Sequence, residues 1–176
     1  MKTSASKNLL KNQPWHLLLK PHYFLAFGFG SGLLPKAPGT FGSVAALPLV
    51  WSMLGLAWWV QLLIILAVFF IGVGVSSAVS RETGLKDDPR IVVDEIAGMA
   101  LTLFFLPMGA AWYWLIPGFL LFRIFDIVKP WPVGWVDRTV KGGLGIMLDD
   151  VVAGLMAGGL LWGAYKVIDL AWLANG

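Results

Sequence analysis

The sequence lacks cysteine and is poor in charge. None of its 176 residues is Cys, which excludes disulfide bonds, thiolate metal sites and a cysteine nucleophile. Charged residues make up 13% of the chain, whereas soluble globular domains carry about 25%. Hydrophobic residues reach 58%, with 10 Trp and 11 Phe among them. This balance predicts a membrane protein.

Several catalytic and binding signatures are also missing. The two histidines, His16 and His22, lie close to the N-terminus, which argues against a histidine nucleophile. No Asp-x-Asp sequence occurs, which argues against the haloacid-dehalogenase type of aspartyl-phosphate chemistry and against the metal motif of lipid phosphotransferases. The chain has no Gly-Lys-Ser/Thr of a phosphate-binding loop. Its net charge of +3 comes without interleaved basic and aromatic residues, so we expect no nucleic-acid partner.

Long apolar runs are what the chain does contain, and they predict membrane-spanning helices. Most of them reach the roughly 17–25 residues that cross a bilayer as a helix. We therefore predict an all-α fold, a polytopic membrane bundle of about five helices, or four if the short third run does not span. The runs are 41–57, 58–80, 91–107, 110–128 and 145–173.

Charge is gathered at one end of these predicted helices. With five spans and a cytoplasmic N-terminus, Lys166 alone among 13 Lys and Arg lies towards the far side, and Asp169 alone among 10 acids. The positive-inside rule then places the polar end in the cytoplasm. We predict a cytoplasmic N-terminal arm over 1–26, without a cleaved signal peptide, and a single membrane-embedded domain over 27–176.

Glycines recur at four-residue spacing in the last apolar run. Gly154 and Gly158 form one such pair, and Gly159 and Gly163 form another. Small residues at this spacing let membrane helices approach closely. We interpret them as packing positions, and they would also suit a homodimer.

Basic and hydroxyl residues flank two of the apolar runs. LLPKAPGTFGS offers Lys36, Thr40 and Ser43 before a helix start, where a hydroxyl could cap the helix or free N–H groups could attract phosphate. In FRIFDIVKPWP, Arg123 and Asp126 are three residues apart and could pair on one helix face, with Lys129 following. These residues predict a polar site that accepts an anion.

Acidic doublets open two of the predicted helices. Asp94 and Glu95 begin the third run, and Asp149 and Asp150 begin the last one. The helix dipole stabilises acids in a first turn, which is one explanation. Adjacent like charges repel unless a cation lies between them, and Mg²⁺ prefers oxygen ligands that it shares with substrate phosphate. The doublets therefore favour a divalent-cation site.

Four blocks in order resemble the phosphatidylglycerophosphatase A family of bacterial membrane phosphatases. They are GLLPKAPGTFGS, DDPRIVVDEIAG, FRIFDIVKPWP and GGLGIMLDDVVAG, and the resemblance covers residues 27 to about 159. It implies a Mg²⁺-dependent phosphatase of the cytoplasmic (inner) membrane. Its substrate would be an anionic phospholipid in the bilayer, phosphatidylglycerophosphate, and its products phosphatidylglycerol and inorganic phosphate, the last step of phosphatidylglycerol synthesis.

The resemblance also carries over candidate site residues, without their individual roles. The expected catalytic carboxylates are Asp88, Asp94, Glu95, Asp126, Asp149 and Asp150. The expected phosphate-binding residues are Lys36, Thr40, Ser43, Arg123 and Lys129. The expected metal ligands are Asp94, Glu95, Asp149 and Asp150.

Our working hypothesis is that metal and basic residues position the phosphate while Asp126 or Asp88 orients a neighbour or acts as general base. The sequence is compatible with attack on the phosphate by water and with attack by an aspartate. The main alternative is a small proton-coupled transporter that uses intramembrane carboxylates. Such a protein would place its charges near the bilayer midplane, whereas here they lie near one face. A non-catalytic membrane scaffold is a third alternative.

Overall fold

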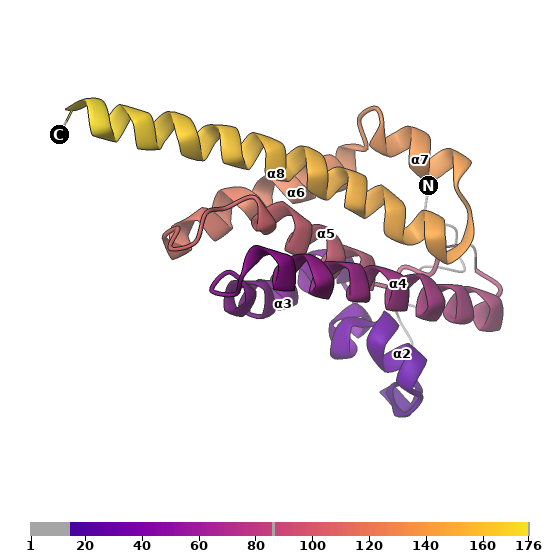
Figure 1. Ribbon diagram of the computed structural model, residues 1–176. Helices are drawn as coiled ribbons and strands as arrows, with labels where there is room; N and C mark the ends of the chain where they lie inside the picture. The colour runs from indigo at the N-terminus through magenta and orange to yellow at the C-terminus, as the bar shows by residue number, and fades with distance from the viewer. Residues whose placement is uncertain (1–14, 86, 176) are drawn as a thin grey trace.

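The computed structural model describes residues 15–85 and 87–175, and in these ranges every regular element is a helix. This confirms the all-α class. Figure 1 shows the helices lying along one another, with the C-terminal part of α8 projecting beyond the rest. The elements are η1 (Trp15–Leu19), α2 (Pro21–Ala26), η2 (Gly28–Leu33), α3 (Pro38–Met53), α4 (Trp58–Thr83), α5 (Val93–Phe104), η3 (Trp112–Trp114), α6 (Leu115–Val128), α7 (Val133–Thr139) and α8 (Gly142–Asn175).

Two of the described helices, α4 and α8, are long and apolar enough to cross a membrane. The predicted count of four to five spans is therefore not confirmed. Helices α3, α5 and α6 have 16, 12 and 14 residues, fewer than the roughly 17–25 of a usual span. The runs 41–57, 91–107 and 110–128 are longer than the helices within them because turns and 3-10 segments, such as η3, take up part of each.

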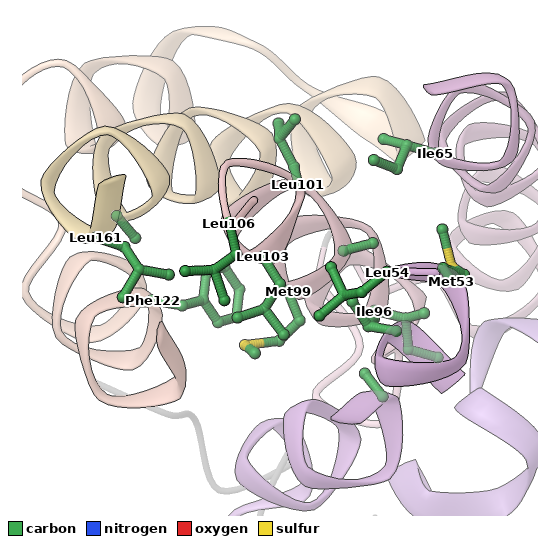
Figure 2. Packing of buried hydrophobic residues seen from close by; sticks show 14 of the residues in the cluster. Met53, Leu54, Ile65, Ile96, Met99, Leu101, Leu103, Leu106, Phe122 and Leu161 are labelled. Carbon is green, nitrogen blue, oxygen red and sulfur yellow. The ribbon is translucent and has the colours of Figure 1, made fainter. Parts of the chain in front are cut away.

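Helix α5 lies at the centre of the molecule and packs against α3, α4, α6 and α8. Most of its side chains are buried, in contrast to those of α4, whose outer face is exposed. Figure 2 shows Met99 and Leu103 of α5 between Phe122 of α6 and Met53 of α3. The position of α5 therefore fixes where its first turn, with its two acids, is held.

Glycines let α5 and α8 pack backbone to backbone. A Cβ on Gly154 of α8 would meet the backbone of Gly98 in α5, and one on Gly158 would meet Phe105 and the Thr102 carbonyl. The Thr102 hydroxyl lies 2.8 Å from the Gly98 carbonyl oxygen. The packing role predicted for the Gly154–Gly158 pair is thus confirmed.

The second glycine pair behaves differently. A Cβ at Gly159 or Gly163 would meet nothing within 4 Å in the described part of the chain. Among the described residues these two positions therefore do not contribute to helix packing, and a homodimer stays a prediction.

The described part of the predicted N-terminal arm packs on the helical bundle. Helix α2 lies against α4, and its Tyr23 and Ala26 are buried in a core with Val79. Lys20 forms an ion pair of 3.3 Å with Glu82 near the end of α4. Residues 1–14 lie outside the described ranges, and the domain boundary at residue 26 stays a prediction.

Candidate active site

A cavity of about 490 Å³ lies where the polar ends of five helices meet. Its walls come from the start of α3, α5 and α8, the end of α6, helix α7 and the loop over 87–91. Because successive long helices run in alternating directions, residues that are far apart in sequence reach this one end. The predicted gathering of polar groups at one end of the bundle is therefore present in the fold.

Three carboxylates converge in this cavity. One oxygen from each of Asp94, Glu95 and Asp150 lies within 4.8 Å of the others. Asp94 and Glu95 stand in the first turn of α5, where no side chain caps the helix, so its free N–H groups favour negative charge. The close approach at Gly98 and Gly154, each one turn further along its helix, brings Asp150 of α8 to this turn.

The cluster fits a divalent cation. Oδ1 of Asp94 and Oε2 of Glu95 are buried and have no hydrogen-bond partner among the described residues. Buried carboxylate oxygens without partners are costly, and hard cations such as Mg²⁺ prefer oxygen ligands. Of the four predicted metal ligands, the structure thus brings three together.

Arg123 of α6 faces the same cluster. Its guanidinium forms an ion pair of 2.5 Å with Asp126 and lies 3.9 Å from Glu95. It also lies 3.4 Å from the hydroxyls of Thr40 and Ser43 in α3. Nε of Arg123 is buried and has no partner within the described ranges, so the guanidinium keeps a donor for a further acceptor.

The start of α3 forms the part of the cavity wall that adjoins Glu95 and Arg123. Ala37 has a left-handed backbone (φ 47°) that directs the chain into Pro38 and Gly39. Thr40 lines the cavity, whereas Ser43 is buried behind it and donates a hydrogen bond of 2.8 Å to the Gly39 carbonyl. Lys36 is exposed and is not among the residues that line the cavity.

Gly39 is in close contact with the acidic cluster. A Cβ at this position would meet Oε1 of Glu95 and Nη1 of Arg123. Only a glycine therefore allows the first turn of α3 to approach the carboxylates this closely. The sequence analysis did not single out Gly39, although it lies inside a block that carries the family resemblance.

Lys129 and Asp149 form an ion pair in the wall of the cavity. Its Nζ donates a hydrogen bond of 2.5 Å to Asp149 and one of 2.8 Å to Asp137. Burial lowers the pKa of Lys129, but the carboxylates of Asp149 and Asp137 outweigh burial and raise the pKa above its ordinary value. Asp149, the fourth predicted metal ligand, is thus paired with a cation of the protein.

Asp88 is engaged in a buried ion pair. Its carboxylate accepts hydrogen bonds of 2.9 and 2.6 Å from Nε and Nη2 of Arg90, and Arg90 lies 5.2 Å from the Phe27 ring centre. Asp88 still borders the cavity. Sequence reasoning missed Arg90 and Asp137. Each belongs to a polar stretch already considered, and the two-residue spacing in DDPR could have suggested the Asp88–Arg90 pair.

Comparison with known proteins identifies the family. A family model described as Phosphatidylglycerophosphatase A matches residues 24–165. The chain belongs to the phosphatidylglycerophosphatase A family. The phosphatidylglycerophosphatase A of Escherichia coli K12 is 44% identical over 161 residues, which cover 92% of this chain and 89% of the relative. That of Haemophilus influenzae is 40% identical over 143 residues, 80% of this chain and 86% of the relative.

A third relative differs in its printed substrate. A Bacteroides thetaiotaomicron protein with the provisional name of a phosphatidylinositol-3-phosphatase is 42% identical over 137 residues, 73% of this chain and 83% of the relative. No solved structure matches the chain. Membership in the phosphatidylglycerophosphatase A family makes the chain a phosphatase that hydrolyses a phosphomonoester, and it does not favour the transporter alternative.

Proposed function

We propose that this protein hydrolyses the terminal phosphate monoester of phosphatidylglycerophosphate in a Mg²⁺-dependent reaction. The products are phosphatidylglycerol and inorganic phosphate, which makes the reaction the last step of phosphatidylglycerol synthesis. The observation that carries the proposal is the cluster of Asp94, Glu95 and Asp150 facing Arg123 inside one cavity. The names of the Escherichia coli and Haemophilus influenzae relatives support the substrate.

Asp94, Glu95 and Asp150 would hold the Mg²⁺. Their unpartnered oxygens and their mutual distances suit a cation that takes carboxylate ligands and shares them with a phosphate. When bound, Mg²⁺ neutralises charge on phosphoryl oxygens and acidifies water. Asp149 completes the acidic wall, where Lys129 compensates its charge.

Arg123 would bind the terminal phosphate together with Thr40. The guanidinium has a free buried donor at Nε, and the Thr40 hydroxyl beside it lines the cavity. Asp126 holds the guanidinium in place through their 2.5 Å ion pair. Lys129 also lines the cavity and adds positive charge, while exposed Lys36 would act only on the approach of the anion.

Phosphoryl transfer needs mainly positioning and electrostatic stabilisation, and these residues supply both. Water or an aspartate of the cluster is the nucleophile. Asp126 is better placed than Asp88 to take the proton of the water that attacks the phosphate, or of the water that hydrolyses a phosphorylated aspartate, because both oxygens of Asp88 accept hydrogen bonds from Arg90. Asp88 then acts by positioning the loop before α5.

The protein would lie in the cytoplasmic (inner) membrane as a multi-pass protein with the cavity facing the cytoplasm. Helices α4 and α8 are long enough to span the bilayer, and we propose that α3, α5 and α6 are embedded beside them, for four to five membrane helices in total. The exposed apolar side chains along α3 and α6 support this arrangement. The aromatic residues at the opposite end, such as Trp58 and Trp112, would then lie at the far interface.

Phosphate release by the purified protein tests this function. The protein is incubated in mixed micelles with phosphatidylglycerophosphate, in the presence of Mg²⁺ or of EDTA. A parallel assay uses phosphatidylinositol 3-phosphate as the substrate. We expect phosphate release that requires Mg²⁺ and is faster with phosphatidylglycerophosphate. If neither lipid releases phosphate, the proposed phosphatase activity is refuted. If the inositol lipid is the better substrate, the proposed headgroup specificity is refuted.

A further inference from the structure

An apolar face of α6 leads directly to the cavity. Ile116, Leu120, Ile124 and Ile127 are 54, 52, 53 and 67% exposed. Residues three and four apart lie on one face of a helix, so these four form a continuous surface, named here the α6 stripe. Among the described residues, no helix packs over these side chains.

The stripe ends at the mouth of the cavity. Ile127 is the member that both lines the cavity and remains exposed. Its neighbour Asp126 pairs with Arg123, the residue that faces the acidic cluster. The cavity and the apolar stripe therefore adjoin each other at Ile127.

The length of the stripe fits one leaflet of a bilayer. From Ile116 to Ile127 there are eleven residue steps, which at a rise of 1.5 Å per residue amount to about 17 Å. Half of the hydrocarbon core of a bilayer is about 15 Å thick. An acyl chain lying along the stripe would thus find an apolar surface about as long as one leaflet is thick.

We propose that the α6 stripe binds an acyl chain of the lipid substrate while the phosphate of the same molecule lies in the cavity. This inference rests on the proposed function, since it requires a membrane lipid as substrate. The chemistry of the two regions matches the two parts of such a molecule. The stripe is purely apolar, and the cavity beside Ile127 holds Arg123, Thr40 and Lys129 for the anionic end.

Photo-crosslinking tests the stripe without turnover. A phosphonate analogue of phosphatidylglycerophosphate, which cannot be hydrolysed, carries a diazirine in its acyl chain, and phosphatidylcholine with the same acyl chain is the reference lipid. We expect the phosphonate lipid to raise labelling of α6 relative to the exposed face of α4 around Ile71, compared with the reference. The proposal would be refuted if the ratio of α6 labelling to α4 labelling were the same for both lipids. It would also be refuted if a second copy of the chain covered α6 and prevented labelling by either lipid.

A pair of matched variants tests the stripe in the reaction. Ile124 of α6 and Ile71 of α4 are 53 and 52% exposed, and neither lines the cavity. An indole at position 124 would push the acyl chain away from the stripe and remove the contacts of one or two of its methylene groups. The ratio of kcat/KM for the diacyl substrate to kcat/KM for the same substrate without acyl chains should therefore fall by about fivefold in Ile124→Trp. Ile71→Trp should keep the wild-type ratio.

The two experiments separate the stripe from the function. An unchanged ratio in Ile124→Trp would refute acyl-chain binding although the protein hydrolyses the lipid. If no phosphate is released but the phosphonate lipid labels α6 selectively, the phosphatase function is refuted and binding of the lipid along the α6 stripe is supported. If Ile124→Trp does not fold, the crosslinking ratio in the wild-type protein decides alone.

Discussion

Gly39 is the residue whose size most directly limits the candidate site. It lies in the first turn of α3 with its α-carbon against the Glu95 carboxylate and the Arg123 guanidinium. A side chain there must displace one of these groups, whereas the helix itself would gain from Ala in place of Gly. Activity and stability are therefore expected to respond in opposite directions.

We predict that Gly39→Ala lowers phosphate release by roughly tenfold to a hundredfold, the cost of misplacing a reacting group by about 1 Å. The thermal unfolding temperature should not fall. Gly55→Ala is the control, because a Cβ at Gly55 meets nothing within 4 Å. Wild-type activity in Gly39→Ala would show that Glu95 can move without consequence.

Lys129 should contribute a pH-dependent part of the stability. Its folded-state pKa is raised by Asp149 and Asp137 despite burial, so the ion pairs stabilise the fold fully below the ordinary lysine pKa of about 10.4. The contribution is lost as the pH rises from there through the raised folded-state pKa. At neutral pH, Lys129 stays protonated.

We predict that Lys129→Met lowers the unfolding temperature at about pH 8, and that the difference from wild type shrinks above about pH 10.4. Thermal unfolding in detergent micelles measures this difference, and Lys166→Met, at an exposed lysine near the other end of α8, is the control. A difference that stays constant into strongly alkaline solution would contradict the assignment.

At the scale of single residues, residue types and their spacing in the sequence identified most of the groups that meet in the cavity. The three-residue spacing of Arg123 and Asp126 allowed the pair that the structure shows. It could not show that Asp149 turns to Lys129 while Asp150 turns to α5, because adjacent helix positions differ by about 100° in direction. That difference depends on how α8 is rotated against its neighbours.

Helices α5 and α8 are the two elements whose contact assembles the acidic cluster. Gly98 and Gly154 allow their backbones to touch one turn away from Glu95 and Asp150. A larger residue would separate the helices at this point. The carboxylates would then move apart together with the helices that carry them.

We predict that Gly154→Ala lowers both stability and Mg²⁺-dependent activity. Inserting a methyl group into this tight contact should cost about 1–3 kcal/mol in the free energy of unfolding. Gly159→Ala is a matched control on the same helix, since a Cβ there meets nothing within 4 Å. Equal stability of the two variants in thermal unfolding would contradict the packing role of Gly154.

Sequence patterns predicted the elements well but not their bounds. The four-residue glycine spacing correctly indicated packing at Gly154 and Gly158, but it could not distinguish this face from the open one at Gly159 and Gly163. Hydropathy located the apolar runs, but three of the helices within them are shorter, as in α5 over Val93–Phe104, and α4 and α8 are longer than their runs. An apolar run predicts that its side chains are buried in lipid or in protein. It does not show at which residue the helix begins or ends.

At the scale of the whole molecule, the direction of each helix determines where the charges lie. The starts of α3, α5 and α8 and the end of α6 meet at the cavity, and exposed aromatic residues such as Trp58 and Trp112 lie at the other ends. Charge distribution along the sequence predicted this polarity. The membrane orientation and the number of spans are proposals that follow from it.

The central claim is that the acidic cluster at this end binds the metal and carries out the phosphatase reaction. Asp150 and Asp169 provide a matched comparison, since both lie on α8 but Asp150 belongs to the cluster and Asp169 is exposed far from it. The decisive measurement is Mg²⁺-dependent phosphate release from phosphatidylglycerophosphate by purified Asp150→Asn and Asp169→Asn proteins of equal stability. We predict a loss of at least about a hundredfold in Asp150→Asn and a wild-type rate in Asp169→Asn; a wild-type rate in Asp150→Asn would contradict the claim.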